Sequence, residues 1–409
     1  MTQIQGYLRA DGRKGIRNVV AVAYLVECAH HVARRIASGM EDDVHVIGFG
    51  GCYPNDYASM MLERLGTHPN VGAVLLVSLG CEGFDRAELA RAIAASGRPV
   101  ETLVIQQNGG TRATIEAGRT WVAEAREQLA AVPRVPMELS ELVVGTICGG
   151  SDSTSGITAN PAVGYAFDRL VESGAVTIFE ETGELIGTEH VMAERAITPE
   201  LGGELVAAVH KAEAYYSVLG HGSFAAGNAE GGLTTIEEKS LGAYAKSGSG
   251  PISGVIKPGD IPGHGGLYLL DVIPDGEVRW GFPNINDNAE AAEIMACGAH
   301  MILFTTGRGS VVGSAISPIV KVCANPQTYE RMAEDMDVNA GRILGGEATL
   351  PEVGEKIFEL VARVAAGEQS ASEAMGHQEF VLTYKSFEPV GPACLPLAAA
   401  PAPPPTTAS

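Results

Sequence analysis

Residues 19–28 read Val-Val-Ala-Val-Ala-Tyr-Leu-Val-Glu-Cys, an apolar run that closes on a cysteine. Three later runs have the same form: 44–50 precedes Cys52, 73–79 precedes Cys81 and 142–147 precedes Cys148. Short runs rich in Val and Ile and bounded by Gly or Pro predict buried strands of a parallel sheet. Such strands share one carboxyl edge, outside which ligands bind. The leading hypothesis is therefore a metal-assisted or thiol-assisted pocket on which Cys28, Cys52, Cys81 and Cys148 converge.

The apolar runs alternate with amphipathic stretches, which predicts an α/β fold of repeated βα units. We expect two units with mostly parallel, Rossmann-like sheets flanked by helices. The first spans residues 1–132 and the second spans 138–388, and Ala131–Pro136 reads as a linker because its two prolines disfavour helix and central strand. Residues 389–409, rich in Pro and Ala, are expected to be a disordered tail.

Further elements follow from the same patterns. Strands are expected at 100–105, 175–179, 266–270, 300–304 and 319–322, and helices at 29–38, 57–65, 85–95, 114–131, 161–172, 201–218, 234–246, 289–297 and 352–366. Thr198-Pro199-Glu200 predicts a helix start, because it offers a cap, a first-position proline and an acid in the first turn.

Composition limits the classes of function. The chain has 409 residues and a formal net charge of −21, which makes nucleic acid and anionic membranes poor partners. The seven cysteines are far apart and no apolar leader precedes the first strand, so we expect free thiols in a reducing cytoplasm. No run reaches the roughly 18 apolar residues of a membrane span.

Two basic or glycine-rich stretches are candidate anion sites. Residues 6–18 carry four basic side chains, of which Arg17 could clamp a carboxylate, although composition alone favours a solvated turn. Gly109, Gly110, Thr111 and Arg112 lie between an expected strand and an expected helix, where backbone N–H groups can bind an anion. Glycines of a tight turn without a ligand are an equal alternative.

Three further motifs carry candidate catalytic residues. Residues 148–156 combine Cys148 and Asp152, a soft and a hard metal ligand, with small residues such as Ser151, and function is favoured over a polar turn. Thr235 and Lys239 share a helix face, where Lys239 is either a carboxylate ligand or a base, unless the face is merely solvated. In residues 305–309, Arg308 between two glycines is expected to be an exposed cation, a weaker anion signal, and Thr306 is a further candidate for substrate binding.

The cysteines also have a structural interpretation. Free cysteine is among the most buried residue types, so packing is favoured over catalysis for any single one. Placement of four thiols at strand ends makes the two interpretations about equal. Cys297 and Cys323 are expected in the core and Cys394 in the tail.

Together these motifs resemble the altronate/galactarate dehydratase family, which includes the large subunit of sulfolactate sulfo-lyase. The resemblance covers about residues 1–385 and rests on GYLRADGRKGIRN at 6–18, GGC at 50–52, HPNV at 68–71, LGCE at 79–82, NGGT at 108–111, CGGSDSTSGITANPA at 148–162, GNAEGGLTTIEEKSLG at 227–242 and LFTTGRG at 303–309.

The resemblance implies a metal-dependent lyase that acts on acyclic hydroxy acids. It would remove the C2 proton, expel the C3 substituent and give an enol that becomes a 2-oxo acid. The implied cofactor is a divalent ion, Fe²⁺ first and Mn²⁺ second, with an iron–sulfur cluster as an open alternative. Cys28, Cys52, Cys81, Cys148 and Asp152 are then candidate ligands; Arg17, Arg112 and Arg308 are candidate clamps; Lys239 is a candidate base.

Two departures from the family pattern stand out. The sugar-acid dehydratases that the sequence resembles carry a small N-terminal domain, whereas this sequence begins at GYLR, so a separate small SAF-type subunit is expected. Residues 271–288 replace a shorter stretch; if this segment lines the pocket, we expect a substrate that differs from the family's named sugar acids. A homo-oligomer is the default for a soluble enzyme.

Four functions compete. The first is dehydration of a sugar acid, and the second is carbon–sulfur cleavage of sulfolactate with release of sulfite and pyruvate. The third is a dinucleotide-dependent oxidoreductase, against which the absence of G-x-G-x-x-G after the first strand argues. The fourth, a non-catalytic binding subunit, is disfavoured by the intact motifs around Cys148 and Lys239.

Overall fold

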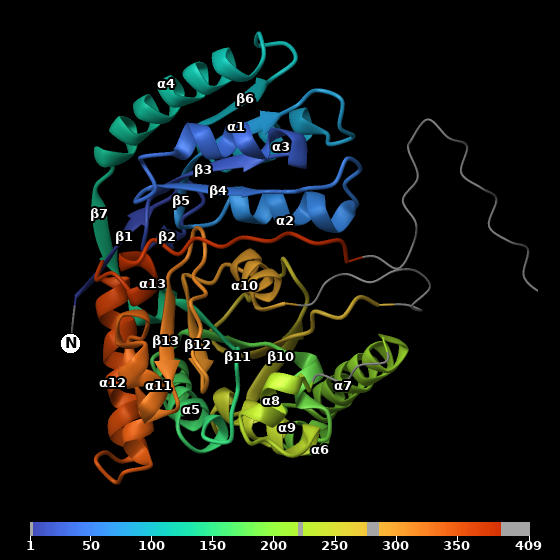
Figure 1. Cartoon of the computed structure of the whole chain (residues 1–409), viewed down its shortest axis with the longest axis vertical. Coiled ribbons are helices and arrows are strands. Elements are labelled where there is room, and N and C mark those ends of the chain that lie inside the picture. Colours follow the sequence, from blue (N-terminus) through green and yellow to red (C-terminus); the bar gives the residue numbers. More distant parts are fainter. Residues whose placement is uncertain (1–2, 220–223, 276–285, 386–409) are drawn as a thin grey trace, which may run out of the picture.

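The computed structural model describes residues 3–219, 224–275 and 286–385 (Figure 1). Its strands are β1 (Ile4–Leu8), β2 (Lys14–Gly15), β3 (Val19–Tyr24), β4 (Val44–Gly48), β5 (Val71–Ser78), β6 (Val100–Val104), β7 (Arg134–Met137), β8 (Val143–Cys148), β9 (Val176–Phe179), β10 (Ile252–Ile256), β11 (Gly266–Leu270), β12 (Met301–Thr306), β13 (Ile319–Cys323) and β14 (Val338–Asn339). Its helices are α1 (Glu27–Ala37), α2 (Asp56–Gly66), α3 (Arg86–Ala95), α4 (Thr111–Ala130), α5 (Ala159–Glu172), α6 (Glu189–Glu194), α7 (Pro199–Leu219), α8 (Ala226–Glu230), α9 (Ile236–Tyr244), α10 (Asp287–Ala296), α11 (Pro326–Arg331), α12 (Leu350–Ala365) and α13 (Ala371–Ala374).

The α/β class expected from the sequence is confirmed. One sheet has the order β4-β3-β5-β6 and another has the order β10-β11-β9-β8-β12-β13-β14, and all neighbouring strands in both are parallel. The strands are short and apolar, and β5 is buried along its whole length, as a strand covered on both faces must be. The predicted helix start at Thr198-Pro199 is confirmed, because α7 begins at Pro199.

The two large sheets share a core through α10. Helices α1 and α4 cover one face of the four-stranded sheet, and α2 and α3 cover the other. Helix α10 packs between α2 and the seven-stranded sheet, whose far face is covered by α5 and α12 (Figure 1). Every residue from Ala289 to Ala296 is buried, so α10 is a central layer of the molecule. Polar side chains on this helix must therefore find partners inside the protein.

The expected linker at 131–136 is wrong in part. Residues Arg134–Met137 form β7, which pairs antiparallel with β1 in a small sheet of order β2-β1-β7. Pro136 is tolerated because β7 is an edge strand, where one missing N–H disturbs no further neighbour. The chain therefore passes between its two large sheets as a strand paired to the N-terminal residues.

Two expectations concern residues outside the described ranges. The tail expected at 389–409 lies there entirely, and so do residues 276–285 of the unusual 271–288 segment. None of the helices in the described part of the chain combines the length and apolar character that a membrane crossing requires.

Candidate active site

The candidate site lies at the carboxyl edge of the seven-stranded sheet. Cys148 is the last residue of β8, and Glu180 and Glu181 directly follow the neighbouring strand β9. Thr146 pairs with Phe179 in the parallel register, so the residues two positions later, Cys148 and Glu181, also lie side by side. The backbone N–H of Cys148 donates to Glu181 Oε2 at 3.0 Å.

A thiol and two carboxylates form the centre of the site. Cys148 Sγ lies 3.3 Å from Glu181 Oε1 and 3.1 Å from Glu184 Oε2, and Glu184 belongs to the short 3-10 turn Thr182–Leu185. The ligand atoms of these three residues lie within 4.8 Å of one another. In the described residues no other group of three His, Cys, Asp or Glu side chains meets that distance.

Two buried lysines complete the centre. Lys246 bonds to Glu181 Oε2, and Lys239 on α9 bonds to Glu184 Oε1. The side chains of the first pair are only 2% and 4% exposed, so these ions are paired away from water. Each carboxylate therefore gives one oxygen to an ammonium group and turns the other oxygen toward the thiol of Cys148.

The pKa values of the centre reflect burial and mutual charge. Burial first, and then the carboxylates of Glu181 and Glu184, raise the pKa of Cys148 well above its ordinary value. Burial and Glu184 raise the pKa of Glu181 to about 7. For Lys239, burial acts to lower the pKa, but Glu184 and Cys148 outweigh it and the pKa lies above its ordinary value. Lys239 is therefore an ammonium group at neutral pH.

The donor set fits a divalent metal ion. One sulfur and two carboxylate oxygens lie within 4.8 Å of one another, close enough to share one ion, and the other oxygen of each carboxylate bonds to a lysine. A thiolate with carboxylates suits iron(II), zinc or manganese better than calcium or magnesium, which prefer oxygen alone. A cation at that position would also favour the thiolate of Cys148, whose pKa the two carboxylates raise.

The backbone at Glu181 is held in an uncommon conformation. Its φ of +76° and ψ of +50° place it in the left-handed region, which costs a non-glycine residue about 1–3 kcal/mol. The conformation turns the chain sharply after β9 and brings both Glu181 and Glu184 to Cys148. Strain of this kind persists at functional sites because surrounding contacts enforce it.

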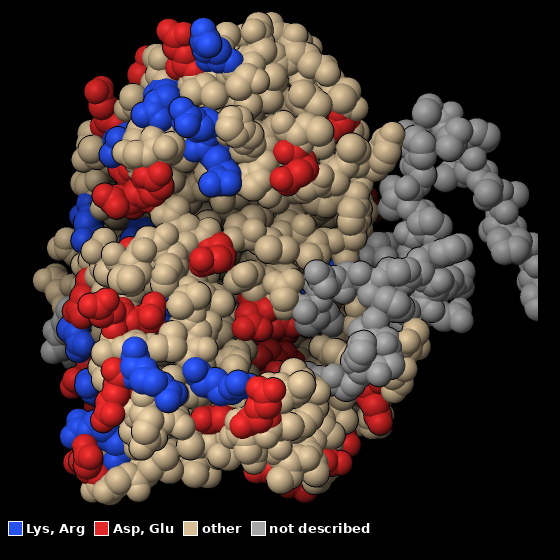
Figure 2. Space-filling model, viewed as in Figure 1, with Lys and Arg blue, Asp and Glu red and all other residues tan. Residues whose placement is uncertain are grey.

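Further carboxyl groups surround the centre. Glu180 is 1% exposed, and neither of its carboxyl oxygens has a hydrogen-bond partner in the described part of the chain. Burial, and then Glu290 on α10, raise its pKa well above the ordinary value. Figure 2 shows Asp and Glu atoms gathered in a hollow near the middle of one face, beside the position of α10 in Figure 1.

Asp287, the first residue of α10, lies against the loop that follows Cys148. A Cβ atom at Gly149 would collide with the carboxylate of Asp287 and with the ring of Phe304, so only glycine permits this approach. Burial, and then the charge of Glu184, raise the pKa of Asp287 to about 6. Asp287 is thus a carboxylate beside the site that titrates near neutral pH.

Helix α9 brings Lys239 to the site through a close contact between glycines. Gly242 on α9 touches Gly156 in the loop after β8, and a Cβ on either would meet the other's backbone. Next to this contact lies a pocket of about 240 Å³, whose wall includes Ser151, Asp152 and Lys239. Ser151 Oγ lies 3.3 Å from Cys148 Sγ, which links the pocket to the centre.

Several residues expected in the site form hydrogen bonds that stabilise their own loop or helix. Asp152 accepts from Thr154 at 2.6 Å and from Asn325 at 3.2 Å, so its carboxylate holds the loop after β8. Thr235 caps α9 by accepting from the N–H of Glu238 at 3.2 Å. Thr306 accepts from Gly309 at 3.0 Å in the loop after β12.

Arg308 lies in the same loop and is exposed, as expected. Its guanidinium donates to the carbonyl of Gly227 at 2.5 Å and pairs with Glu230 at 3.0 Å. Both partners belong to α8, so Arg308 joins the loop after β12 to that helix.

Arg17 is not near this site. Its guanidinium forms a two-pronged ion pair with Glu373 at 2.7 and 2.8 Å and donates to the carbonyls of Val364 and Glu368. It therefore ties the N-terminal residues to the end of α12 and to α13, and the carboxylate clamp expected from sequence is wrong.

Replacing Arg17 with Ala is expected to lower stability by about 1.5–3 kcal/mol, because charge-assisted hydrogen bonds of a partly buried group are lost. Chemical denaturation would measure the change. The matched control is Arg112→Ala, where an exposed side chain is removed with an expected effect within about 0.5 kcal/mol. If Arg17→Ala kept the wild-type denaturation midpoint but had a raised KM, Arg17 would be a substrate-binding residue after all.

Gly109, Gly110, Thr111 and Arg112 are also remote from the site. They form the turn into α4, and residues 111–112 are exposed. Figure 1 shows α4 on the outer side of the four-stranded sheet, away from the seven-stranded sheet.

The expectation that four thiols converge on one pocket is wrong. Cys28, Cys52 and Cys81 follow strands of the four-stranded sheet, whereas Cys148 ends a strand of the seven-stranded sheet. All three are exposed, whereas Cys148 is buried. Cys297 and Cys323 are buried, as expected.

Four residues of the site were missed from sequence: Glu181, Glu184, Lys246 and Asp287. A signal existed for two of them, since Phe179-Glu-Glu-Thr-Gly-Glu-Leu185 places acids directly after an expected strand. Lys246 stood at the end of an expected helix and Asp287 in a segment without periodicity. Only the fold brings them to Cys148.

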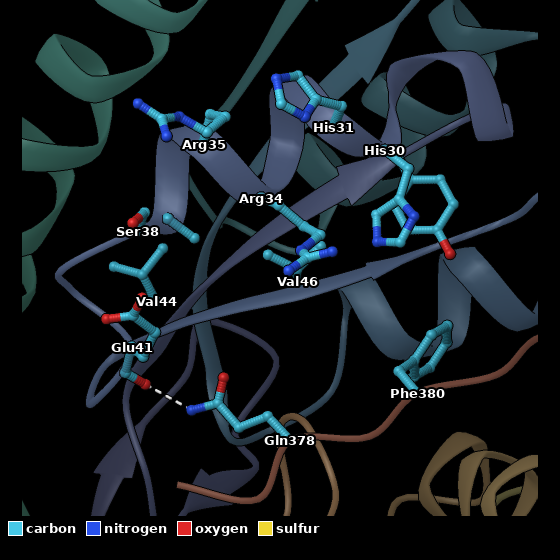
Figure 3. A pocket seen from close by; sticks show the side chains of 12 residues that line it. His30, His31, Arg34, Arg35, Ser38, Glu41, Val44, Val46, Gln378 and Phe380 are labelled. Atoms are coloured by element: carbon cyan, nitrogen blue, oxygen red, sulfur yellow. Dashed lines mark hydrogen bonds between the residues drawn. The ribbon is translucent and has the colours of Figure 1, made fainter.

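A larger concavity, of about 550 Å³, lies on the other unit, between α1, β4 and residues 378–380. Figure 3 shows Arg34 reaching into it toward Val46, and Gln378 donating to the backbone of Glu41 at 2.5 Å. None of its lining residues belongs to the centre around Cys148.

Two family models match the chain. The model described as D-galactarate/altronate dehydratase, C-terminal, covers residues 139–387, and the model described as D-galactarate dehydratase/altronate hydrolase, second domain, covers residues 6–130. The centre around Cys148 lies wholly within the first of these.

Curated relatives fall into two kinds. The (2R)-sulfolactate sulfo-lyase subunit beta of Chromohalobacter salexigens is 35% identical over 393 residues, with 92% of this chain and 96% of the relative covered. Two relatives come from Escherichia coli: an altronate dehydratase, 30% identical with 93% and 77% covered, and the galactarate dehydratase (L-threo-forming), 31% identical with 89% and 73% covered. The dehydratases thus extend beyond the shared region, whereas the sulfo-lyase subunit does not.

Proposed function

The chain belongs to the D-galactarate/altronate dehydratase family and is a lyase, and we propose that it eliminates water from an acyclic sugar acid to give a 2-keto-3-deoxy acid. The observation that carries the proposal is the three-donor face of Cys148, Glu181 and Glu184, backed by two lysines. We propose that this face holds a divalent ion, Fe²⁺ first and Mn²⁺ second. Bound there, the ion would act as a Lewis acid that stabilises the enolate.

The residues of the chain have distinct roles in this proposal. The ammonium groups of Lys239 and Lys246 orient the two ligand carboxylates and stabilise negative charge that develops on the substrate. Asp287 accepts the C2 proton, because a base works best when its pKa lies near the working pH. Lys239, the base considered from sequence, is a protonated cation in this arrangement. Ser151 lines the pocket where the substrate would enter.

The many carboxyl groups around the centre favour a polyhydroxy acid, and thus dehydration, over sulfolactate. Among the described residues, five carboxyl groups and the ammonium groups of two lysines lie at or around the centre: Glu180, Glu181, Glu184, Asp287 and Glu290 with Lys239 and Lys246. Carboxyl groups accept hydrogen bonds from hydroxyl groups, of which a sugar acid offers several and sulfolactate only one. The alternative, a sulfo-lyase large subunit, is supported by the near-complete coverage of the Chromohalobacter relative.

We also propose a separate small subunit. The curated dehydratases are longer than the region they share with this chain, and the sulfo-lyase relative is named as one subunit of an enzyme. A small SAF-type partner would supply what the longer dehydratases carry within one chain. The free thiols of the described cysteines are compatible with a reducing cytoplasm, which we propose as the location.

The test is product formation by the full chain, co-expressed with the small open reading frame beside its gene, purified without oxygen and loaded with Fe²⁺ or Mn²⁺. Altronate, galactarate, related aldonates and sulfolactate would be supplied, and 2-oxo acid and sulfite would be measured. A 2-oxo acid from a sugar acid without sulfite is the expected result. Sulfite from sulfolactate alone would replace dehydration by desulfonation.

Replacing Glu184 with Gln is expected to weaken metal binding by at least roughly 10–100-fold, because it removes one anionic ligand and the partner of Lys239. Isothermal titration of the apo-protein with Mn²⁺ measures this directly, independently of turnover. The matched control is Glu359→Gln, on the exterior of α12. Equal Mn²⁺ affinity in wild type and Glu184→Gln would show that the metal lies elsewhere.

A further inference from the structure

Three exposed thiols follow adjacent strands at the carboxyl edge of the four-stranded sheet. Free cysteine is usually buried, and Cys148, Cys297 and Cys323 follow that rule. The other three described cysteines are all exposed and all follow strands of one sheet: Cys28 after β3, Cys52 after β4 and Cys81 after β5. Exposed thiols are accessible to oxidation and to metal ions, so their exposure calls for a functional explanation.

The fold places these three thiols on adjacent loops. The strand order β4-β3-β5 makes their three strands neighbours. Backbone hydrogen bonds then link the loops to one another. Glu27, next to Cys28, donates to the carbonyl of Gly50 at 3.2 Å, and Gly83 donates to the carbonyl of Cys52 at 2.8 Å. Each cysteine thus lies within two residues of a backbone hydrogen bond that joins its loop to a neighbouring loop.

The loop that carries Cys81 is held by hydrogen bonds of the buried residue Glu82. Glu82, the next residue, is only 8% exposed and accepts from the hydroxyl of Ser78 and from the N–H of Gly80 at 2.8 Å. This inward anchor leaves the neighbouring Cys81 on the outside. The loop with Cys52 is held by Tyr384, whose hydroxyl donates to the carbonyl of Tyr53 at 2.5 Å. These contacts hold the loops that carry Cys81 and Cys52 in place.

The spacing argues against one ion that is bound by all three thiols. Two thiolates that share one ion lie at most about 4.6 Å apart, since a zinc–sulfur bond is about 2.3 Å. Cys28, Cys52 and Cys81 do not form a group of three within 4.8 Å, the distance that Cys148 and its two carboxylates meet. An iron–sulfur cluster is larger than one ion, and cysteine thiolates are its usual ligands.

We propose that Cys28, Cys52 and Cys81 hold an iron–sulfur cluster at this edge, with three protein thiolates and one iron left open. The N-terminal turn of α1, which contains Cys28, favours the negative charge of the bound thiolates. Iron and sulfide come from the cell's cluster-assembly chemistry, and no electron transfer is needed for binding. The proposal is independent of the centre around Cys148, with which these residues share no sheet.

The experiment uses the full chain purified without oxygen and reconstituted with Fe²⁺ and sulfide. Acid-labile sulfide, visible absorption and the electron paramagnetic resonance spectrum after reduction are the readouts. Wild type is expected to hold labile sulfide, and Cys28→Ser, Cys52→Ser and Cys81→Ser are each expected to lose most of it. Before reconstitution, circular dichroism and melting temperature of the variants should equal the wild-type values, because the replaced side chains are exposed.

Two controls separate this site from the other one. Cys297→Ala removes a buried thiol and should keep the sulfide. Cys148→Ser should also keep the sulfide while it weakens Mn²⁺ binding, so failure of the proposed lyase centre would leave this result intact. Wild type that binds iron without labile sulfide would overturn the proposal, as would a triple variant that retains wild-type sulfide.

Discussion

Replacing Asp287 with Asn is expected to lower kcat/KM by roughly 10²–10⁴-fold, the usual contribution of a positioned proton acceptor. Its carboxylate lies against Gly149, next to Cys148, and its pKa is raised to about 6 by burial and by Glu184. A base must be unprotonated to act, so wild-type kcat/KM should rise as the pH rises through about 6 and then level off. Asn cannot titrate, so the residual activity of the variant should lose this acidic limb.

The matched control is Asp42→Asn, at an exposed position, which should keep both the rate and the pH profile. Far-UV circular dichroism and Mn²⁺ affinity would show that Asp287→Asn still folds and binds metal. If the acidic limb persisted in Asp287→Asn, another group would be the base, and Glu181 would be examined next because its pKa is also raised.

Replacing Lys246 with Met is expected to destabilise the protein by about 3–5 kcal/mol, the cost of leaving a buried charge without its partner. Lys246 and Glu181 are almost fully buried, and nothing else in the described residues pairs with Lys246. Loss of the ammonium group should drive the folded-state pKa of Glu181 upward. When the folded-state pKa of a carboxyl group is raised, the protein loses stability as the pH rises through that value. The stability difference between Lys246→Met and wild type should therefore grow toward alkaline pH.

Urea denaturation at several pH values would measure the deficit. The control is Lys356→Met, an exposed position on α12, for which a change within about 0.5 kcal/mol is expected. The double variant Lys246→Met/Glu181→Gln should recover part of the loss, because no buried charge is then left unpaired. A single variant as stable as wild type would show that water reaches Glu181.

The strands and most helices followed from sequence because their signal is local. The run at 19–26 and the other Val-rich runs predict buried strands, since a strand covered on both faces must be apolar along its length. The start of α7 was predicted from a local signal too, the capping residue Thr198 followed by Pro199. Cys148, Ser151 and Lys239 were candidates because each stands in a motif at the end of a strand or on a helix face, and the structure brings them close together.

Other assignments failed because the sequence does not say which strands are neighbours. Four thiols followed four similar strands, yet three belong to one sheet and Cys148 to the other. Arg17 looked like a free cation, and its partner Glu373 lies 356 positions away. No local pattern records a contact over that separation.

The sequence by itself determined the α/β class, the family and the motif around Cys148, since these depend on short-range patterns of apolar residues and on long matching strings. Only the tertiary structure decided which charges meet. It places Glu181, Glu184 and Lys246 around Cys148 and sets Asp287 beside Gly149. The physical reason is that a buried charge is stabilised by whatever partner the packing of sheets and helices brings to it, and that packing joins residues far apart along the chain.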